Sequence, residues 1–205
     1  MNIKKVGIIV IILLISGTAA LFAFNGQTDM ELRKNGYKVT EESNSSLKKL
    51  KIVSTMNGTI KKAKKVILDI ANYKNFMPNI KSSEIFDKKD GCLLTYTIMN
   101  APIISNRDYV LKVCSKKIDN NNFKVYWDTI KDERYPVKKK NVRVTENNGY
   151  WLIKKVNDKQ IEVTYSFAIN PKASAPSFMI NRANKATIVK IIKSIEKEIK
   201  KKEKL

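Results

Sequence analysis

The chain has 205 residues, a length that suits one domain with or without a targeting segment. It carries 40 lysines and arginines against 19 aspartates and glutamates, a net charge of +21, and no histidine. The missing histidine excludes Ser-His-Asp and Cys-His catalysis and His-ligated zinc or haem. Two cysteines are too few for a structural zinc site or an iron–sulfur cluster. We therefore expect no metal and no cofactor.

The basic residues are almost all lysine. Only five of the 40 are arginine, and the lysines are spread through the whole chain. Recognition of base edges and phosphates favours arginine, so this ratio argues against a nucleic-acid partner. We interpret the excess as a solvated lysine surface that also favours contact with an anionic membrane.

The first 24 residues have the composition of a targeting segment. Lys4 and Lys5 precede 19 residues without a charge, Val6–Phe24, in which small residues lie near the end. This pattern predicts either a secretory signal peptide or an uncleaved N-terminal membrane anchor over 1–24. In both cases residues 25–205 form a single domain outside the cytoplasm, in the periplasm or anchored to the inner membrane.

The domain begins with two predicted strands, at 37–42 and 50–56. Thr59 is a favourable N-cap for a helix from 60 to about 70, in which apolar residues recur three and four positions apart. Pro78 ends the helical structure soon afterwards.

The pattern then alternates with period two, which is typical of half-buried strands. In the clearest case, Ile161, Val163, Tyr165 and Phe167 face one way and polar or small residues face the other. We expect an antiparallel sheet with one covered face and one wet face, in the form of a six-strand meander. The predicted strands are 92–99, 109–115, 123–128, 141–145, 149–153 and 161–169.

A long helix is predicted from Ser177 to about Lys200. Small residues occupy its apolar stripe in the first half and isoleucines in the second, so it lies close against a large apolar surface. The covered face of the sheet is the surface available. The predicted fold class is therefore α+β, with helices on one side of a curved antiparallel sheet.

Several segments carry a family resemblance through their order and spacing. They are Ala71–Ser83, Pro102–Val110 with its Arg-Asp pair, 142–144, 149–151, 163–165 and Asn170–Asn181. They resemble the helix-grip superfamily, which holds the START (steroidogenic acute regulatory protein-related lipid transfer) domains, polyketide cyclases and ubiquinone-binding proteins. The chain departs from the pattern at Phe76, where tryptophan is common, and at Ala173-Ser174-Ala175, where a glycine is usual. The identity of the ligand therefore does not follow from the resemblance.

The resemblance runs from about Tyr37 to Ile199. It implies a helix-grip fold, in which the sheet wraps around the long C-terminal helix and encloses a hydrophobic cavity. A curved sheet held by one helix also favours such a cavity on physical grounds. Each candidate lining residue has an alternative interpretation as ordinary core. The candidates are Ile98, Trp127, Trp151, Tyr165, Phe167, Met179, Ala183 and Ala186.

Arg107 and Asp108 are the charged residues at the start of a predicted strand. One of them could point into the cavity and bind the polar head of a ligand, or both could anchor the strand entry. Arg107 shares its face with Tyr109 and Leu111, which favours the cavity. Arg143 alternates with its apolar neighbours and is expected on the wet face.

Cys92 and Cys114 form a candidate disulfide. The turn between their strands is centred near residue 103, so a symmetric hairpin places the two cysteines directly opposite one another. Export would allow the bond. The alternative is two small buried apolar residues.

The leading functional hypothesis is a monomeric, non-enzymatic domain of the bacterial cell envelope. It would bind one lipid or other hydrophobic small molecule, with or without transferring it, and the last helix or the loop at 101–106 would open as a gate. The alternative is a polyketide cyclase/aromatase-like enzyme, for which only carboxylate, lysine, tyrosine or arginine could act as acid or base. A third hypothesis is binding to a membrane surface or a partner through the lysine-rich end at 190–204.

Overall fold

The computed structural model describes residues 37–42, 49–100, 105–172 and 177–201, and the structural statements below concern these ranges. The predicted targeting segment at 1–24 lies outside the described residues. No helix within the described ranges is both long enough and apolar enough to cross a membrane. The division into a targeting segment and a domain beginning at residue 25 stays a prediction.

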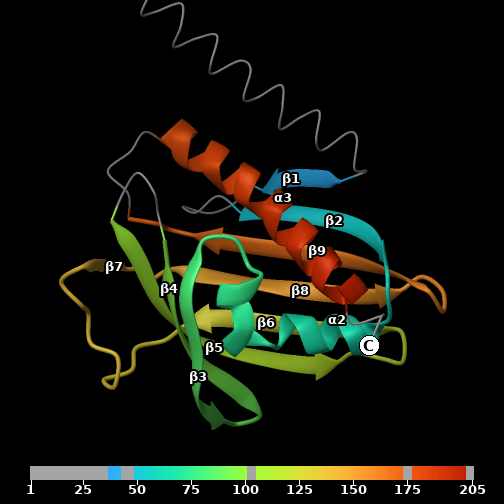
Figure 1. Ribbon diagram of the computed structural model, residues 1–205, viewed down its shortest axis with the longest axis horizontal. Helices are drawn as coiled ribbons and strands as arrows, with labels where there is room; N and C mark the ends of the chain where they lie inside the picture. Colours follow the sequence, from blue (N-terminus) through green and yellow to red (C-terminus); the bar gives the residue numbers. More distant parts are fainter. Residues whose placement is uncertain (1–36, 43–48, 101–104, 173–176, 202–205) are drawn as a thin grey trace, which may run out of the picture. The chain divides into compact units, whose positions relative to one another are not determined.

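Nine strands form one curved sheet (Figure 1). They are β1 (Lys38–Glu42), β2 (Lys49–Asn57), β3 (Ile80–Lys89), β4 (Cys92–Met99), β5 (Asn106–Lys117), β6 (Asn122–Thr129), β7 (Asn141–Arg143), β8 (Asn147–Lys155) and β9 (Gln160–Ile169). Their order in space is β1-β2-β9-β8-β6-β5-β4-β3, and all neighbours along this path are antiparallel. Because β2 pairs with β9, strands from the two ends of the domain lie side by side in the sheet.

The predicted meander is wrong at β7. This short strand leaves the order and pairs in parallel with Asn106–Asp108 of β5, so that β6 pairs directly with β8. The chain between β6 and β7 is held on the outer face of the sheet by aromatic packing. The Tyr135 ring lies 4.5 Å, centroid to centroid, from both Phe86 of β3 and Tyr96 of β4. These contacts direct the chain away from β6 and toward the start of β5.

β3 has no counterpart among the predicted strands, because its alternation is broken. The pairing of β3 with β4 shifts register between Ile80 and Ser82 and again between Ile85 and Asp87. Each irregularity places two residues opposite one and moves the following side chains to the other face. A strand with two such shifts in ten residues has no continuous period-two pattern to detect.

The predicted wet face of β9 is also covered in part. Thr164, Ser166 and Ala168 are at most 6% exposed. β9 is an interior strand, and the residues opposite on this face have longer side chains: Tyr150 lies opposite Ser166, and Lys49 lies opposite Ala168. The Lys49 ammonium lies 5.7 Å from the centroid of the Tyr150 ring. Long neighbours thus shield the small residues between them.

The first described helix, α2 (Ile60–Ile67), is shorter than predicted. It begins as expected, with the Thr59 hydroxyl accepting a hydrogen bond from the Lys62 amide at 3.4 Å. A short 3-10 helix, η2 (Ile70–Asn75), follows it. The Tyr73 hydroxyl of η2 donates a hydrogen bond to the carbonyl of Ile67, one of the carbonyls that a helix end leaves without an intrahelical partner.

The last helix, α3 (Ser177–Lys201), crosses the sheet near β2 and contacts α2 near its C-terminal end (Figure 1). Near this end Ile199 is fully buried and packs against Gly58. A Cβ atom at Gly58 would lie 2.7 Å from Ile199 Cγ2, and the φ of +142° at Gly58 also favours glycine. Among the residues of α3 whose burial the structure describes, the buried ones run from the middle of the helix toward its C-terminal end: Ile188, Val189, Ile191, Ile192, Ile195 and Ile199.

The first half of α3 is more exposed. Met179 is 46% exposed, and Ala183 is exposed as well. The helix is therefore fixed mainly by its C-terminal half. A curved antiparallel sheet held by one long helix confirms the predicted α+β helix-grip fold.

Candidate ligand-binding cavity

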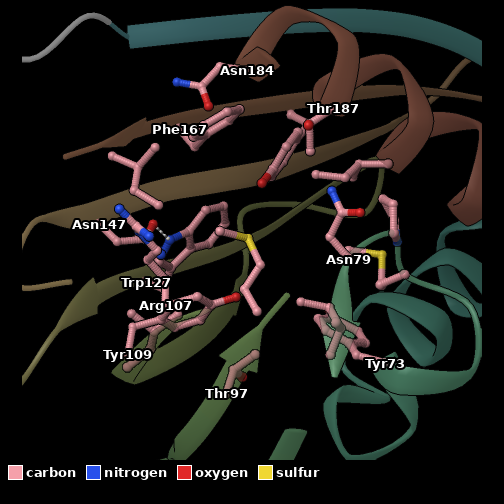
Figure 2. Close-up of a pocket in the computed structure, with 18 of the residues that line it drawn as sticks. Tyr73, Asn79, Thr97, Arg107, Tyr109, Trp127, Asn147, Phe167, Asn184 and Thr187 are labelled. Carbon is pink, nitrogen blue, oxygen red and sulfur yellow. Dashed lines mark hydrogen bonds between the residues drawn. The ribbon is translucent and has the colours of Figure 1, made fainter. Parts of the chain in front are cut away.

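A cavity of about 350 Å³ lies between the inner face of the sheet and α3. Its wall combines residues of α2, η2, six strands (β3, β4, β5, β6, β8 and β9) and α3, and most of them are apolar. Figure 2 shows side chains from these elements converging on one space. The volume is within the range of small-molecule sites, roughly 300 to 1,000 Å³.

One wall of the cavity is a run of aromatic rings. The ring of Tyr165 is stacked 4.0 Å from that of Trp151, and it also lies 5.8 Å from Trp127 and 5.3 Å from Phe167, centroid to centroid. All four residues are at most 9% exposed. The alternation of β9 places Tyr165 and Phe167 on the same face, and the pairing of Trp151 with Tyr165 sets the two strands in register.

Gly149 allows Trp127 to lie flat against β8. A Cβ atom at this position would lie 2.4 Å from Trp127 Cζ2 and 2.3 Å from the carbonyl oxygen of Ser166. The close approach brings the indole N–H within 3.0 Å of Asn147 Oδ1, to which it donates a hydrogen bond (Figure 2). Any larger residue at 149 would displace the indole from the cavity wall.

Three tyrosines add hydroxyl groups to the apolar lining. Tyr73 donates to the carbonyl of Ile67, the Tyr109 hydroxyl is hydrogen-bonded to Thr97, and the Tyr165 ring stacks with both tryptophans. Burial raises the pKa of Tyr109 to about 12 and raises the pKa of Tyr73 and Tyr165 further. These hydroxyls therefore stay protonated at neutral pH.

Arg107 lies on the cavity wall and is 3% exposed. Its Nε donates to the carbonyl of Pro171 at 2.9 Å, one terminal nitrogen donates to the carbonyl of Lys172 at 3.3 Å, and the other donates to the carbonyl of Ser105. Burial lowers the pKa of this guanidinium. The side chain ties the start of β5 to the chain that leaves β9, so it anchors the strand entry as well as facing the cavity.

Asp108 lies on the opposite face of the sheet. It is fully buried, and its carboxylate accepts hydrogen bonds from Arg143 Nε at 2.7 Å and from the Tyr96 hydroxyl at 2.9 Å. Burial alone would raise the pKa of Asp108, but the hydrogen bonds from Arg143 and Tyr96 hold it below its ordinary value. Arg143 lies on the outer face, as its alternation predicts, but this face is not wet there, because the Asp108 carboxylate and the carbonyl of Tyr135 hold the side chain on the sheet, 14% exposed.

Seven of the nine cavity candidates lie on the wall, and two do not. Ile98 is on the outer face, because its strand neighbours Thr97 and Met99 face the cavity and strand residues alternate. Ala186 is displaced by about 100° around α3 from the lining residue Thr187. The candidates on the wall are Arg107, Trp127, Trp151, Tyr165, Phe167, Met179 and Ala183.

Much of the polar lining is missing from the predicted set. Tyr109 has a sequence signal, because it shares strand parity with Arg107. Tyr73 has none, because η2 has too few residues for a recognisable period. Asn147 is found only through the contact with Trp127. The other uncharged polar side chains on the wall are Asn79, Thr95, Thr97, Asn100, Asn184 and Thr187.

The described residues offer no metal site. No three acidic or cysteine side chains among them lie close enough together to bind an ion. Of the described residues that line the cavity, Arg107 alone is charged. Hydroxyl, amide and guanidinium groups thus provide the polar chemistry of this part of the wall.

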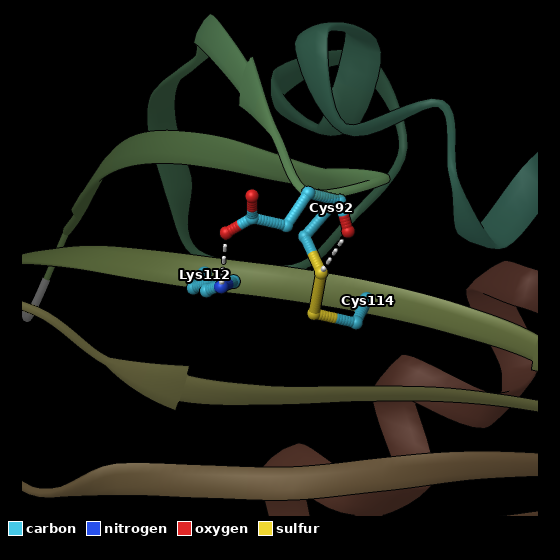
Figure 3. Close-up of a disulfide and its surroundings, with 4 residues drawn as sticks. Cys92, Lys112 and Cys114 are labelled. Atoms are coloured by element: carbon cyan, nitrogen blue, oxygen red, sulfur yellow. Dashed lines mark hydrogen bonds and ion pairs between the residues drawn. A yellow bond between two sulfur atoms is a disulfide. The ribbon is translucent and has the colours of Figure 1, made fainter.

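Cys92 and Cys114 are joined by a disulfide at one end of β4 and β5 (Figure 3). Their Cα atoms are 4.3 Å apart, and the neighbouring pair, Leu93 opposite Val113, has the register of the expected symmetric hairpin. Strand parity places the bond on the outer face with Asp108. An ion pair of 3.3 Å between Lys112 and Asp90 lies next to it (Figure 3).

Comparisons with known proteins agree with this architecture. The family model described as polyketide cyclase / dehydrase and lipid transport matches residues 65–196. The chain is similar to the structure of a STAR-related lipid transfer protein from Xanthomonas axonopodis, with 24% identity, a TM-score of 0.71, and coverage of 80% of this chain and 92% of that one. No curated protein matches the sequence.

Two further structures show how widely the fold is used. Human STARD10 has 19% identity and a TM-score of 0.71, covering 81% of this chain and 74% of that one. The Zhui aromatase/cyclase from a Streptomyces species has 10% identity and a TM-score of 0.59, and the match covers 75% of this chain and 94% of that one. At these identities the likeness establishes the fold alone. The family model spans more than half of the sequence, so the chain belongs to the polyketide cyclase / dehydrase and lipid transport family, as the START-like resemblance of its segments predicts.

Proposed function

We propose that the protein is a non-enzymatic carrier that binds one lipid or other hydrophobic small molecule in the cavity beneath α3. The observation that carries this proposal is the mostly apolar cavity of about 350 Å³ with its stacked aromatic wall. Binding in this cavity would remove the apolar surface of a ligand from water. Each Å² removed contributes roughly 25 cal/mol of favourable free energy. The family supports hydrophobic-ligand binding in general.

The first half of α3 is the proposed gate. Met179 and Ala183 line the cavity and are exposed, whereas the apolar face of the helix is buried from Ile188 onward. Displacing the first half would uncover the cavity while the second half stays packed. The loop at 101–106 is a second proposed gate, and its residues 101–104 lie outside the described part of the chain.

We place the carrier outside the cytoplasm, in the bacterial cell envelope, acting as a monomer. The proposal rests on the charge-free run at 6–24 after two lysines and on the disulfide between Cys92 and Cys114, which persists in oxidising compartments. The net charge of +21 would draw the protein to an anionic membrane surface, where a hydrophobic ligand is taken up or released.

A cyclase-like enzyme in the same cavity is the second candidate. It is favoured by the family description and by the tyrosine hydroxyls on the wall. The raised pKa values of Tyr73, Tyr109 and Tyr165 argue against them as general bases at neutral pH. The carrier is therefore the better supported function.

The deciding experiment is to purify the full-length chain without added lipid, extract it with organic solvent, and identify the extract by mass spectrometry. We expect one hydrophobic molecule per protein, and transfer of that molecule between vesicles when protein is added. An empty protein that neither binds nor transfers hydrophobic molecules would contradict the proposal. Turnover of a polyketide substrate would establish the second candidate in its place.

A further inference from the structure

The hydroxyl of Tyr165 belongs to a buried residue of the cavity wall and has no hydrogen-bond partner among the described residues. The residue is 9% exposed and lines the cavity, and its ring is fixed by stacking on Trp151 at 4.0 Å. Among the described residues, no side chain or backbone group forms a hydrogen bond with its hydroxyl. The hydroxyls of Tyr73 and Tyr109 differ, because each has a protein partner. Hydroxyls of buried residues are nearly always hydrogen-bonded, so this one indicates a partner, water or ligand, that occupies the cavity.

The amide of Asn147 provides a second donor beside the same indole. The N–H of Trp127 can only donate, so the Asn147 oxygen must face it, at 3.0 Å. The NH₂ group of Asn147 is then directed elsewhere and has no hydrogen bond to any described residue. Tyr165 also borders the Trp127 ring, at 5.8 Å between centroids. Asn147 and Tyr165, each with a donor that has no partner among the described residues, thus both border the Trp127 indole.

The charge on the wall limits what these donors can bind. Of the described lining residues only Arg107 is charged, and each of its three nitrogens donates to a backbone carbonyl. No carboxylate lines the described cavity to receive a cationic head group. Burial of an ionised group in an apolar cavity costs far more than burial of a carbonyl or hydroxyl that receives a hydrogen bond.

We propose that the cavity selects an uncharged amphiphile, and that the Tyr165 hydroxyl and the Asn147 amide donate hydrogen bonds to its carbonyl or hydroxyl oxygen. The inference rests on the proposed binding function and specifies the ligand class. The ligand chain then lies along Trp151 and Phe167, while its oxygen faces the two donors. The strongly raised pKa of Tyr165, caused first by burial and then by Tyr109 and Tyr73, keeps its hydroxyl protonated as a donor.

The two tryptophans make a direct test possible. Both tryptophans of the chain, Trp127 and Trp151, line the cavity, so intrinsic fluorescence reports its occupancy. Delipidated full-length protein is titrated with dodecan-2-one, dodecane and, at pH 8, dodecanoate. We expect the ketone to bind more tightly than both the alkane and the ionised acid.

The variant Tyr165→Phe tests the hydroxyl itself. The ratio of ketone affinity to alkane affinity should fall about fivefold, the effect of one net hydrogen bond. The melting temperature should stay close to that of wild type, because the hydroxyl has no protein partner to lose. The matched control is Tyr126→Phe, on a 40% exposed tyrosine of β6 that does not line the cavity, which should leave the ratio unchanged.

Three results would overturn the inference. Dodecanoate binding more tightly than the ketone would show that Arg107 recruits an anion. An unchanged ketone-to-alkane ratio in Tyr165→Phe, with alkane binding intact, would remove the role of the hydroxyl and leave the carrier function standing. Failure of all three probes and of lipid extracts to bind wild type would overturn the carrier function together with this inference.

Discussion

Arg107 and Asp108 are consecutive residues of β5, and their side chains lie on opposite faces of the sheet. Arg107 faces the cavity and binds backbone carbonyls, whereas Asp108 is fully buried on the outer face and pairs with Arg143 at 2.7 Å. One dipeptide thus serves two separate structural tasks. The outer pair leads to the first two predictions.

Replacing Asp108 with asparagine should strongly destabilise the protein. The change leaves the Arg143 guanidinium without its anion in a largely buried site, and breaking such a pair costs about 3 kcal/mol or more. Urea denaturation at neutral pH measures the loss. Asp87→Asn is the matched control, because its pair with Arg134 is 42% and 52% exposed, and a solvent-exposed pair contributes far less to stability than a buried one. Equal losses in the two variants would contradict the prediction.

The same carboxylate should produce a defined pH dependence. The pKa of Asp108 is lower in the folded state, so its ionisation stabilises the fold above the unfolded value of about 4, and this contribution is lost as the pH falls through the folded value. The stability difference between wild type and Asp108→Asn should stay constant from about pH 8 to about pH 5 and shrink below about pH 4. Urea denaturation at a series of pH values tests this. A difference that already disappears near neutral pH would argue against it.

Gly149→Ala should damage both stability and the cavity. The added Cβ would lie 2.4 Å from Trp127 and 2.3 Å from the Ser166 carbonyl, so the indole must move away from Asn147. We expect a loss of about 1 to 3 kcal/mol, typical of overpacking, and a shift of the tryptophan emission. Gly91→Ala is the control, since its Cβ would meet nothing within 4 Å and the cost is only that of its φ of +72°. Unchanged emission in Gly149→Ala would disprove the predicted movement.

Removal of the disulfide should destabilise the protein without emptying the cavity. The bond closes a loop with a sequence separation of 22, for which chain entropy gives about 3 kcal/mol. Denaturation of a Cys92→Ala, Cys114→Ala double variant measures the loss of stability. A reductant should lower the stability of wild type and leave that of the double variant unchanged. The mass of the intact protein after alkylation, with and without reduction, shows whether the bond forms. Free thiols in the unreduced protein would contradict the disulfide.

Filling the cavity should exclude the ligand. Thr187 lines it from α3, so Thr187→Phe places a large ring in the space (Figure 2). We expect the amount of co-purified hydrophobic molecule to fall by more than about half, with little loss of stability because the site gains apolar contacts. Ala186→Phe, one position away and off the wall, should retain its ligand. Equal retention in both variants would mean that the ligand binds elsewhere.

Regular alternation in the sequence predicts the centre of the fold well. β9 lies within one residue of its predicted bounds, and β4 matches them, because these strands alternate without interruption. The symmetric hairpin also gives the register that brings Cys92 and Cys114 together. Strand parity then places Arg107, Trp127 and Tyr165 on the cavity side.

The remaining features depend on contacts that a local pattern does not contain. β3 has two register shifts, and β7 is placed by the packing of Tyr135 against Phe86 and Tyr96. Ile98 is predicted on the wrong face, because its hydrophobicity favours the cavity whereas strand parity places it on the outer face. Asn147, on the polar part of the wall, has no signal in the sequence. Its role follows only from the hydrogen bond that it accepts from Trp127, a contact between different strands.

The carbonyls bound by Arg107 give the cavity a mechanical connection to the last helix. Pro171 and Lys172 lie on the path from β9 to α3, and their carbonyls are held by a side chain that also lines the cavity. A ligand that pushes this guanidinium aside would release the approach to α3 at its less packed end. Loading and opening would then be coupled with the same sign: a ligand that loosens the cover binds more tightly when the cover is open, and holding the cover open strengthens its binding by the same factor.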